Sequence, residues 1–174
     1  AYKGKITQRV SIDQRPSIVD EKSRIGDWEA DLMLGGQGGG ALLTVVERKS
    51  RWTCMARLPS KQSEVVAEAL INLLRPYKKQ VKTVTLDNGN EFAQHVNVSK
   101  ALQASVYFAH PYCAWQRGLS ENTNGLLRQY FPKGTNFKII RQAKLDQIQK
   151  RLNQRPRKGL EFLTPQHIFQ PGRS

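Results

Sequence analysis

Hydrophobic and polar residues alternate from Trp28 to Leu34, which predicts a strand with one face turned to a core. A continuous apolar run follows a glycine-rich turn and is typical of a strand buried on both faces. The third strand is expected to pair with the second as a hairpin through residues 48–50. The pattern predicts five strands in all, at residues 28–34, 41–46, 51–58, 81–86 and 106–108.

A helical period begins at Ser60, where apolar residues from Val65 to Leu74 recur on one stripe and Pro76 marks the end. Further helices are expected at residues 91–103, 120–131 and 140–153, and after Thr164 and Pro165. Three strands followed by alternating helices and strands predict an α/β fold with a mixed five-stranded sheet flanked by helices. Residues 1–24 are expected to form an N-terminal arm or linker, and residues 25–174 one domain with basic C-terminal helices.

Charge is the strongest global signal. The 28 basic and 14 acidic residues give a net charge of +14, which favours a polyanionic partner. Residues 117–174 hold twelve basic and three acidic residues, a net charge of +9, whereas residues 25–116 carry only +2. This asymmetry favours nucleic acid over a merely solvated basic surface.

Other protein classes fit the sequence poorly. No apolar run is long enough to span a membrane, and no signal peptide is visible at the start. The cysteines, Cys54 and Cys113, are too far apart for a zinc or redox motif, and a reducing cytosol is the simplest setting. The glycines at 35–40 lack the pattern of a nucleotide-binding P-loop.

Three acidic residues occupy positions suited to chemistry: Asp31 within the first strand, Asp87 at the end of the fourth, and Glu121 at the start of a helix. Each has a simpler explanation. Asp31 could face solvent, Asp87 could serve a turn, and Glu121 could complement a helix N-terminus. Together, three carboxylates in a basic protein would repel unless a cation bound them, and oxygen ligands suit Mg²⁺ or Mn²⁺.

Three segments carry a family resemblance: Gly26–Leu32, Thr85–Phe92 and Pro111–Gly134. They resemble the DDE transposases of bacterial insertion sequences, in the insertion-sequence family numbered thirty, and the tail Leu152–Lys158 agrees. The resemblance covers about residues 24–169. It implies an RNase H-like fold of the retroviral integrase type and places the catalytic, metal-binding triad on Asp31, Asp87 and Glu121. The N-terminal helix-turn-helix region of such transposases is missing, so the chain looks like a catalytic core.

The resemblance also implies a mechanism and partners. Two Mg²⁺ or Mn²⁺ ions would support cleavage of DNA at transposon ends and attack of the freed 3′-OH on target DNA. We expect a cytoplasmic, nucleoid-associated bacterial protein without a membrane contact, which forms a homo-oligomer on DNA. Two alternatives stay open: an RNase H-fold nuclease or resolvase without strand transfer, and a catalytically inactive DNA-binding core.

Candidate DNA contacts come from the loop before the Glu121 helix, from that helix, and from the basic tail. Asn124 and Arg128 fall on the same helix face as Glu121. Ordinary solvent exposure or core packing is the alternative for each residue. The candidate contacts are Trp115, Arg117, Asn124, Arg128, Lys133, Lys150, Arg151, Arg155, Arg157 and Lys158.

Overall fold

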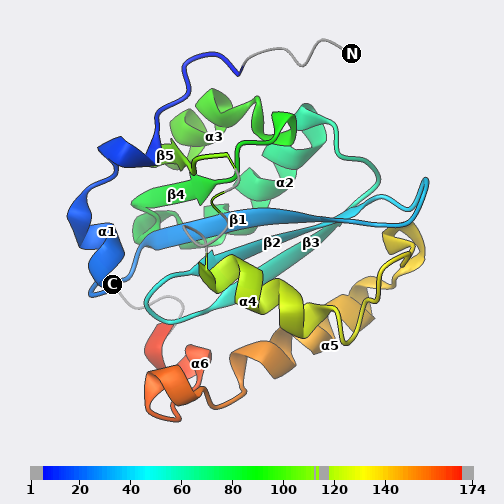
Figure 1. Ribbon diagram of the computed structural model, residues 1–174. Helices are drawn as coiled ribbons and strands as arrows, with labels where there is room; N and C mark the ends of the chain where they lie inside the picture. Colours follow the sequence, from blue (N-terminus) through cyan, green and yellow to red (C-terminus); the bar gives the residue numbers. More distant parts are fainter. Residues whose placement is uncertain (1–5, 112, 114–117, 170–174) are drawn as a thin grey trace.

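A five-stranded mixed sheet forms the centre of the computed structural model, which describes residues 6–111, 113 and 118–169 (Figure 1). The strands are β1 (Asp27–Leu34), β2 (Ala41–Glu47), β3 (Thr53–Leu58), β4 (Thr83–Leu86) and β5 (Ser105–Phe108). Their order across the sheet is β3-β2-β1-β4-β5. The first three strands pair antiparallel, whereas β4 is parallel to β1 and β5 is parallel to β4. The five predicted strands and the mixed sheet are confirmed, with ends shifted by at most two residues.

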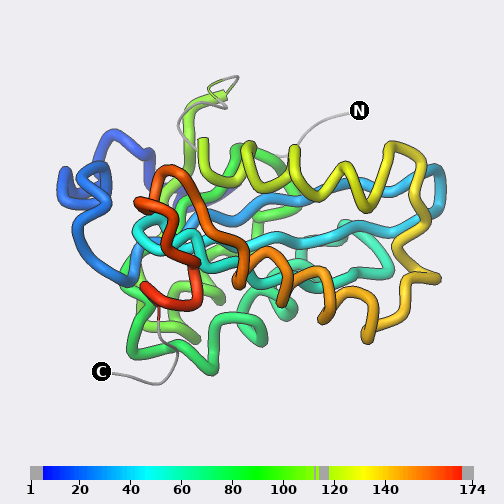
Figure 2. Tube along the Cα trace, turned by 90° about the horizontal axis from the view of Figure 1, so that it is seen from below, coloured from blue at the N-terminus to red at the C-terminus, as the bar shows by residue number. Residues whose placement is uncertain are grey.

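Helices cover both faces of the sheet. The α-helices are α1 (Ser17–Glu21), α2 (Ser63–Leu74), α3 (His95–Leu102), α4 (Gly118–Leu127), α5 (Gln142–Asn153) and α6 (Pro165–Phe169). Short 3₁₀ turns lie before and between them at Ile12–Gln14, Arg75–Gln80, Asn90–Phe92, Phe137–Ile139 and Lys158–Leu160. Figure 2 shows the strands between α4 on one side and α2 and α3 on the other. Within the described ranges, no helix combines the length and apolar character needed to cross a membrane.

The two faces of the sheet bury separate cores. One core joins Trp28 of β1 to Leu70 of α2, Val98 of α3 and Phe169 of α6. The other joins Met33 of β1 and Leu42 of β2 to Leu127 of α4 and Ile148 of α5. Successive side chains of a strand point to opposite faces, so Trp28 and Met33, five positions apart, belong to different cores.

The N-terminal segment from residue 6 to residue 24 packs against the sheet. The Phe108 amide donates to the Val10 carbonyl oxygen at 2.9 Å. Ser11 and Phe108 form an isolated parallel β-bridge. The segment therefore lies beside β5 before it reaches α1. This contact brings the residues before β1 close to the end of β4.

Candidate functional site

Asp31 and Asp87 lie at corresponding positions on neighbouring parallel strands. The register of β1 and β4 pairs Glu29 with Thr85 and Ala30 with Leu86. Asp31 follows Ala30 in β1, and Asp87 follows Leu86 at the end of β4, so the two aspartates take the next position of this register. β4 ends at Leu86, whereas β1 continues to Leu34. The long strand therefore carries Asp31 to the point where its shorter neighbour ends, and both carboxylates are half-buried there.

Hydrogen bonds orient both carboxylates. Asp31 Oδ1 accepts the Leu32 amide at 2.8 Å, and Asp31 Oδ2 accepts Nδ2 of Asn124 at 3.0 Å. The Thr44 hydroxyl donates to Oδ1 of the same Asn124 at 3.1 Å. Asp87 Oδ1 accepts the Gly89 amide at 2.9 Å, as expected for an Asp-Asn-Gly turn. The turn interpretation and a ligand role are compatible, because the turn also fixes the direction of the Asp87 carboxylate.

Helix α4 carries Glu121 and turns one face towards β1. Asn124, which touches Asp31, lies one turn after Glu121, and residues three apart share a helix face. The Glu121 side chain is exposed. Over the part of the chain that the structure describes, no three His, Cys, Asp or Glu side chains are gathered closely enough to hold a metal ion. The oxygen donors themselves, carboxylates and an amide, are those that Mg²⁺ and Mn²⁺ prefer.

Glu29 fixes the start of α4, a role that the sequence did not indicate. Its side chain is 0% exposed, and its Oε2 accepts the Ser120 amide at 2.8 Å. Its Oε1 accepts Nη1 of Arg48, and Nε of Arg48 donates to the Val19 carbonyl oxygen at 3.2 Å. Glu29 thus satisfies an amide at the N-terminus of the helix, immediately before Glu121, and lies two residues from Asp31.

A second arginine lines the same face of the sheet. Arg15, from the N-terminal segment, donates to the Thr85 hydroxyl at 2.9 Å and to Asp20 at 2.6 Å. Burial lowers the pKa of Arg15, and the nearby charge of Arg48 lowers it further. Arg9 of the same segment donates to Oδ1 of Asn88, the residue after Asp87. The N-terminal segment therefore takes part in the surroundings of the two aspartates.

The expected DNA contacts fall into three groups. Trp115 and Arg117 lie outside the described residues. On and after α4, Asn124 contacts Asp31, Arg128 donates to the Phe131 carbonyl oxygen at 3.3 Å, and Lys133 is exposed. In the tail, Arg157 is only 7% exposed, whereas its basic neighbours are exposed. Those exposed neighbours are Lys150, Arg151, Arg155 and Lys158.

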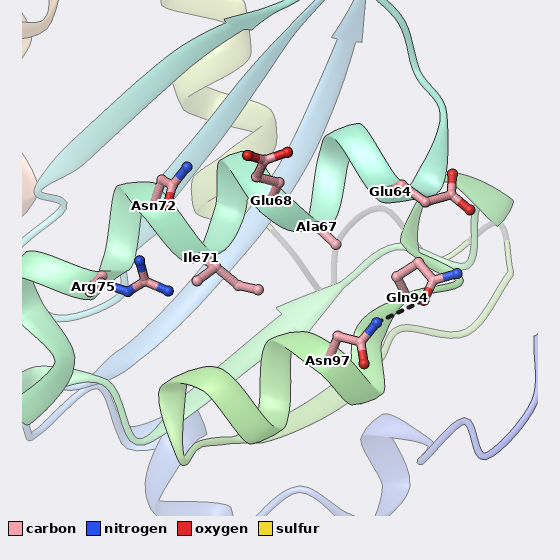
Figure 3. A pocket seen from close by; sticks show the side chains of 8 residues that line it. All are labelled: Glu64, Ala67, Glu68, Ile71, Asn72, Arg75, Gln94 and Asn97. Atoms are coloured by element: carbon pink, nitrogen blue, oxygen red, sulfur yellow. Dashed lines mark hydrogen bonds between the residues drawn. The ribbon is translucent and has the colours of Figure 1, made fainter.

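A groove of about 380 Å³ lies elsewhere, between α2 and α3 (Figure 3). One wall includes Glu64, Glu68 and Arg75 from α2 and its end. On the α3 side, Asn97 Nδ2 donates to Gln94 Oε1 at 2.9 Å. These helices cover the sheet face opposite to Asp31. The groove is therefore separate from the aspartate pair.

The mixed five-stranded sheet flanked by helices is an RNase H-like fold of the retroviral integrase type. The family described as "Integrase core domain" matches residues 21–114, more than half of the chain. The chain belongs to this family. The matched range includes Asp31 and Asp87 and ends before α4.

Curated relatives give the resemblance in more detail. The chain is 43% identical over 169 residues to the transposase for insertion sequence element IS4351 of Bacteroides fragilis, covering 97% of this chain and 52% of that protein. It is 40% identical over 168 residues to transposase InsI for insertion sequence element IS30A of Escherichia coli (strain K12), covering 96% and 44%. The chain thus spans about half the length of the curated relatives it matches. The resemblance to the insertion-sequence family numbered thirty is confirmed.

Solved structures confirm the fold. The crystal structure of the catalytic core domain of BIV integrase superposes with a TM-score of 0.61 at 22% identity, covering 83% of this chain and 93% of that one. A chain in the cryo-electron microscopy structure of the simian T-cell lymphotropic virus intasome, in complex with PP2A regulatory subunit B56 gamma, gives a TM-score of 0.69 at 18% identity. It covers 86% of this chain and 56% of the other. At these identities the likeness concerns the fold.

Proposed function

We propose that this chain is the catalytic core of a DNA transposase that cuts a phosphodiester at the end of an insertion sequence and joins the freed 3′-OH to target DNA. The observation that carries the proposal is the alignment of Asp31 with Asp87 at the ends of adjoining parallel strands, with α4 held against Asp31 through Asn124. The transposases of about 40% identity support it. Residues 25–174 would form the core and residues 1–24 an arm.

In this proposal, Asp31, Asp87 and Glu121 hold the divalent ions. When bound, two Mg²⁺ or Mn²⁺ ions supply charge neutralisation at the reacting phosphate and an activated oxygen nucleophile. Asp31 and Asp87 supply oxygen ligands from a rigid sheet. Glu121 supplies a third carboxylate from α4, whose start is fixed by Glu29. Asn124 and Arg128 share the helix face of Glu121 and would contact DNA next to the cut.

The partners in this proposal are DNA and further copies of the chain. The exposed lysines and arginines on and after α5 would follow the phosphate backbone, and oligomers would assemble on DNA in the bacterial cytoplasm. A nuclease or resolvase with the same carboxylates would cut DNA without joining strands. The products of the reaction separate these two functions.

The test is Asp87→Asn, assayed on labelled duplexes that carry the ends of the insertion element, with Mg²⁺ or Mn²⁺ present. The amide keeps the acceptor for the Gly89 amide but loses the anion, so cleavage should fall by more than about 100-fold while DNA binding is retained. Asp146→Asn is the matched control, because Asp146 is exposed on α5 and accepts a hydrogen bond from the neighbouring Gln142 side chain.

Three results would count against the proposal. Normal cleavage by Asp87→Asn would reduce Asp87 to a turn residue. Cleavage by the wild-type chain in the presence of EDTA would show that the reaction does not need divalent metal ions. Shortened products with no strands longer than the substrate would favour the nuclease over the transposase.

A further inference from the structure

The turn between β2 and β3, which carries Arg51, lies beside the segment between α5 and α6, which carries Arg155 and Arg157 (Figures 1 and 2). Arg51 lies in that turn with a φ of 62°. Its guanidinium lies so close to Gly159 that a side chain at position 159 would clash with it. Gly159 therefore leaves the space that the Arg51 side chain occupies.

Arg157 is buried next to this arginine. It is 7% exposed, and its Nη2 donates to the Leu152 carbonyl oxygen at 2.9 Å. Its Nε is buried and has no hydrogen-bond partner in the described part of the chain. Burial lowers the pKa of the Arg157 guanidinium, and the charges of Arg155 and Arg51 lower it further. A buried donor on a cation without a partner is costly, and a bound anion is one group that can satisfy both the donor and the charge.

No carboxylate compensates these charges among the described residues. The ion pairs there join Arg15 to Asp20, Arg24 to Asp27, Arg48 to Glu29, and His110 to Asp13. None of them includes a member of the three-arginine cluster, Arg51, Arg155 and Arg157. The cluster is thus a concentration of like charge that an external anion would relieve.

The cluster is held together by buried hydrogen bonds. Asn153, at the end of α5, is 2% exposed and accepts the Thr53 amide while donating to the Thr53 carbonyl oxygen, both at 2.9 Å. These bonds fasten the end of α5 to the start of β3, two residues after Arg51. The arginines are therefore brought together by the fold before any ligand arrives, which lowers the entropic cost of binding.

We propose that Arg51, Arg155 and Arg157 form a binding site for a backbone phosphate of DNA, separate from the carboxylates. Guanidinium groups match phosphate oxygens with paired hydrogen bonds. Asp31 pairs with Thr44, and the turn that carries Arg51 begins after Glu47, three residues or about 10 Å further along β2. A duplex bound at the carboxylates would reach this site. The inference rests on the proposed action on DNA.

The neighbouring loop favours DNA over a free phosphate ion. Residues 157–163 fold back on themselves, since the Phe162 amide donates to the Arg157 carbonyl oxygen at 2.8 Å and the Arg157 amide to the Leu163 carbonyl oxygen at 3.0 Å. Phe162 adopts a left-handed φ of 65° and is 70% exposed. An exposed aromatic ring in a loop that also carries basic residues is typical of nucleic-acid contacts, where it packs on a base or sugar.

The experiment uses Arg51→Gln and Arg155→Gln in the full chain, with Arg75→Gln as control. Arg75 is exposed at the end of α2 and lines the groove of Figure 3, away from the cluster. First, the melting temperature is measured with inorganic phosphate against chloride at equal ionic strength. We expect phosphate to stabilise the wild type and Arg75→Gln, and to stabilise the two cluster variants much less.

The second measurement is duplex DNA affinity against salt concentration. Each cluster variant should flatten the slope of log K against log salt by about 0.9, the value for one lost phosphate contact. In chloride alone, Arg155→Gln should melt at the wild-type temperature or above it, because one repelling charge is gone. A merely structural arginine would lower that temperature.

The outcomes separate this inference from the proposed function. An equal phosphate effect in wild type and cluster variants would overturn the site. A phosphate effect that disappears in the variants, with an unchanged DNA slope, would assign the site to free phosphate and overturn the DNA contact. Asp87→Asn should keep both effects, so a failure of catalysis leaves the phosphate site standing, and a failure of the site leaves catalysis standing.

Discussion

The two faces of β1 differ in what they bury, although they belong to one strand. On one face, Trp28 and Ala30 are fully buried in the core under α2. On the other, Asp27 pairs in register with Thr83, and Glu29 with Thr85; Asp31 and Asp87 follow as the next residues along the two strands. The first face consists of side chains whose burial is favourable by itself. From Asp27 to Asp31 the second consists of polar groups, whose burial is tolerated when each has a partner.

The partners on the polar face include one neighbour in the sequence, Arg24, and residues from distant parts of the chain. Arg24 donates to both oxygens of Asp27 at 2.9 and 3.0 Å, and the Thr83 hydroxyl donates to Asp27 Oδ1 at 2.8 Å. Arg48 and the Ser120 amide satisfy Glu29. Towards the end of β4 exposure increases, since Asp27 and Glu29 are buried whereas Asp31 and Asp87 are half-buried. The polar face thus changes from a structural network into a site open to a ligand.

Replacement of Trp28 by alanine should have the largest effect on stability. Its indole is 0% exposed, packs against Tyr77 and Phe169, and donates to the Gln80 carbonyl oxygen at 2.9 Å. The cavity should lower the free energy of unfolding by about 4 kcal/mol, measured by urea denaturation. Ile139→Ala, at a site 75% exposed, should change it by less than about 0.5 kcal/mol. If the two variants were equally stable, the apolar face would not be the main source of stability.

Glu29→Gln should cost less stability and have a different signature. It leaves the Arg48 charge buried without its carboxylate, which should lower the free energy of unfolding by about 3 kcal/mol. It also weakens the acceptor for the Ser120 amide, so amide exchange in the first turn of α4 should accelerate relative to the turn at Leu127. Trp28→Ala should not produce this local difference.

The control for Glu29 is Glu64→Gln. Glu64 is also an acidic residue in the first turn of a helix, α2, but it is exposed. Its replacement should leave both stability and exchange in α4 close to wild type. Uniform acceleration throughout the Glu29→Gln chain would show that Glu29 supports only global stability and does not position α4.

The alternation along β1 was sufficient to predict that Glu29 and Asp31 share a face, but not that Glu29 is buried. Its partners, Arg48 and Ser120, lie 19 and 91 residues away, and their approach depends on tertiary packing. The alignment of Asp31 with Asp87 likewise depends on the register of β1 with β4, which local pattern does not determine. The strands themselves were predictable because their period reports burial directly.

The basic tail shows a related limit. Composition predicted a phosphate-binding face, and four of its five named cations are exposed. Arg157 is the exception, because the loop after α5 folds back and encloses its guanidinium against the Leu152 carbonyl oxygen. A count of charges gives every arginine the same weight. In the fold, Arg157 is buried and held by a hydrogen bond, whereas the other four cations are exposed to solvent.

The smallest predicted effect concerns the two cysteines, which report on the two sides of the molecule. Cys54 of β3 is 2% exposed beside Trp52 and Tyr77, and burial raises its pKa to about 12. Cys113, in the loop before α4, is half-exposed. At about pH 8 a thiol reagent should label Cys113 rapidly and Cys54 only at the rate of unfolding. Single Cys→Ser variants identify each reaction, and labelling of Cys54 as fast as Cys113 would contradict the buried apolar face.

The same group predicts a pH dependence with a definite sign. Folded Cys54 keeps its proton to higher pH than the unfolded thiol, whose ordinary pKa is 9.0, so its contribution to stability is lost as pH rises from about 9 towards 12. Tyr77 acts in the same direction, because burial raises its pKa above 10.0. The wild type should therefore lose stability over this range more steeply than Cys54→Ala, as followed by urea denaturation at successive pH values. Parallel curves would show that the Cys54 thiol ionises equally easily in the folded and unfolded chains.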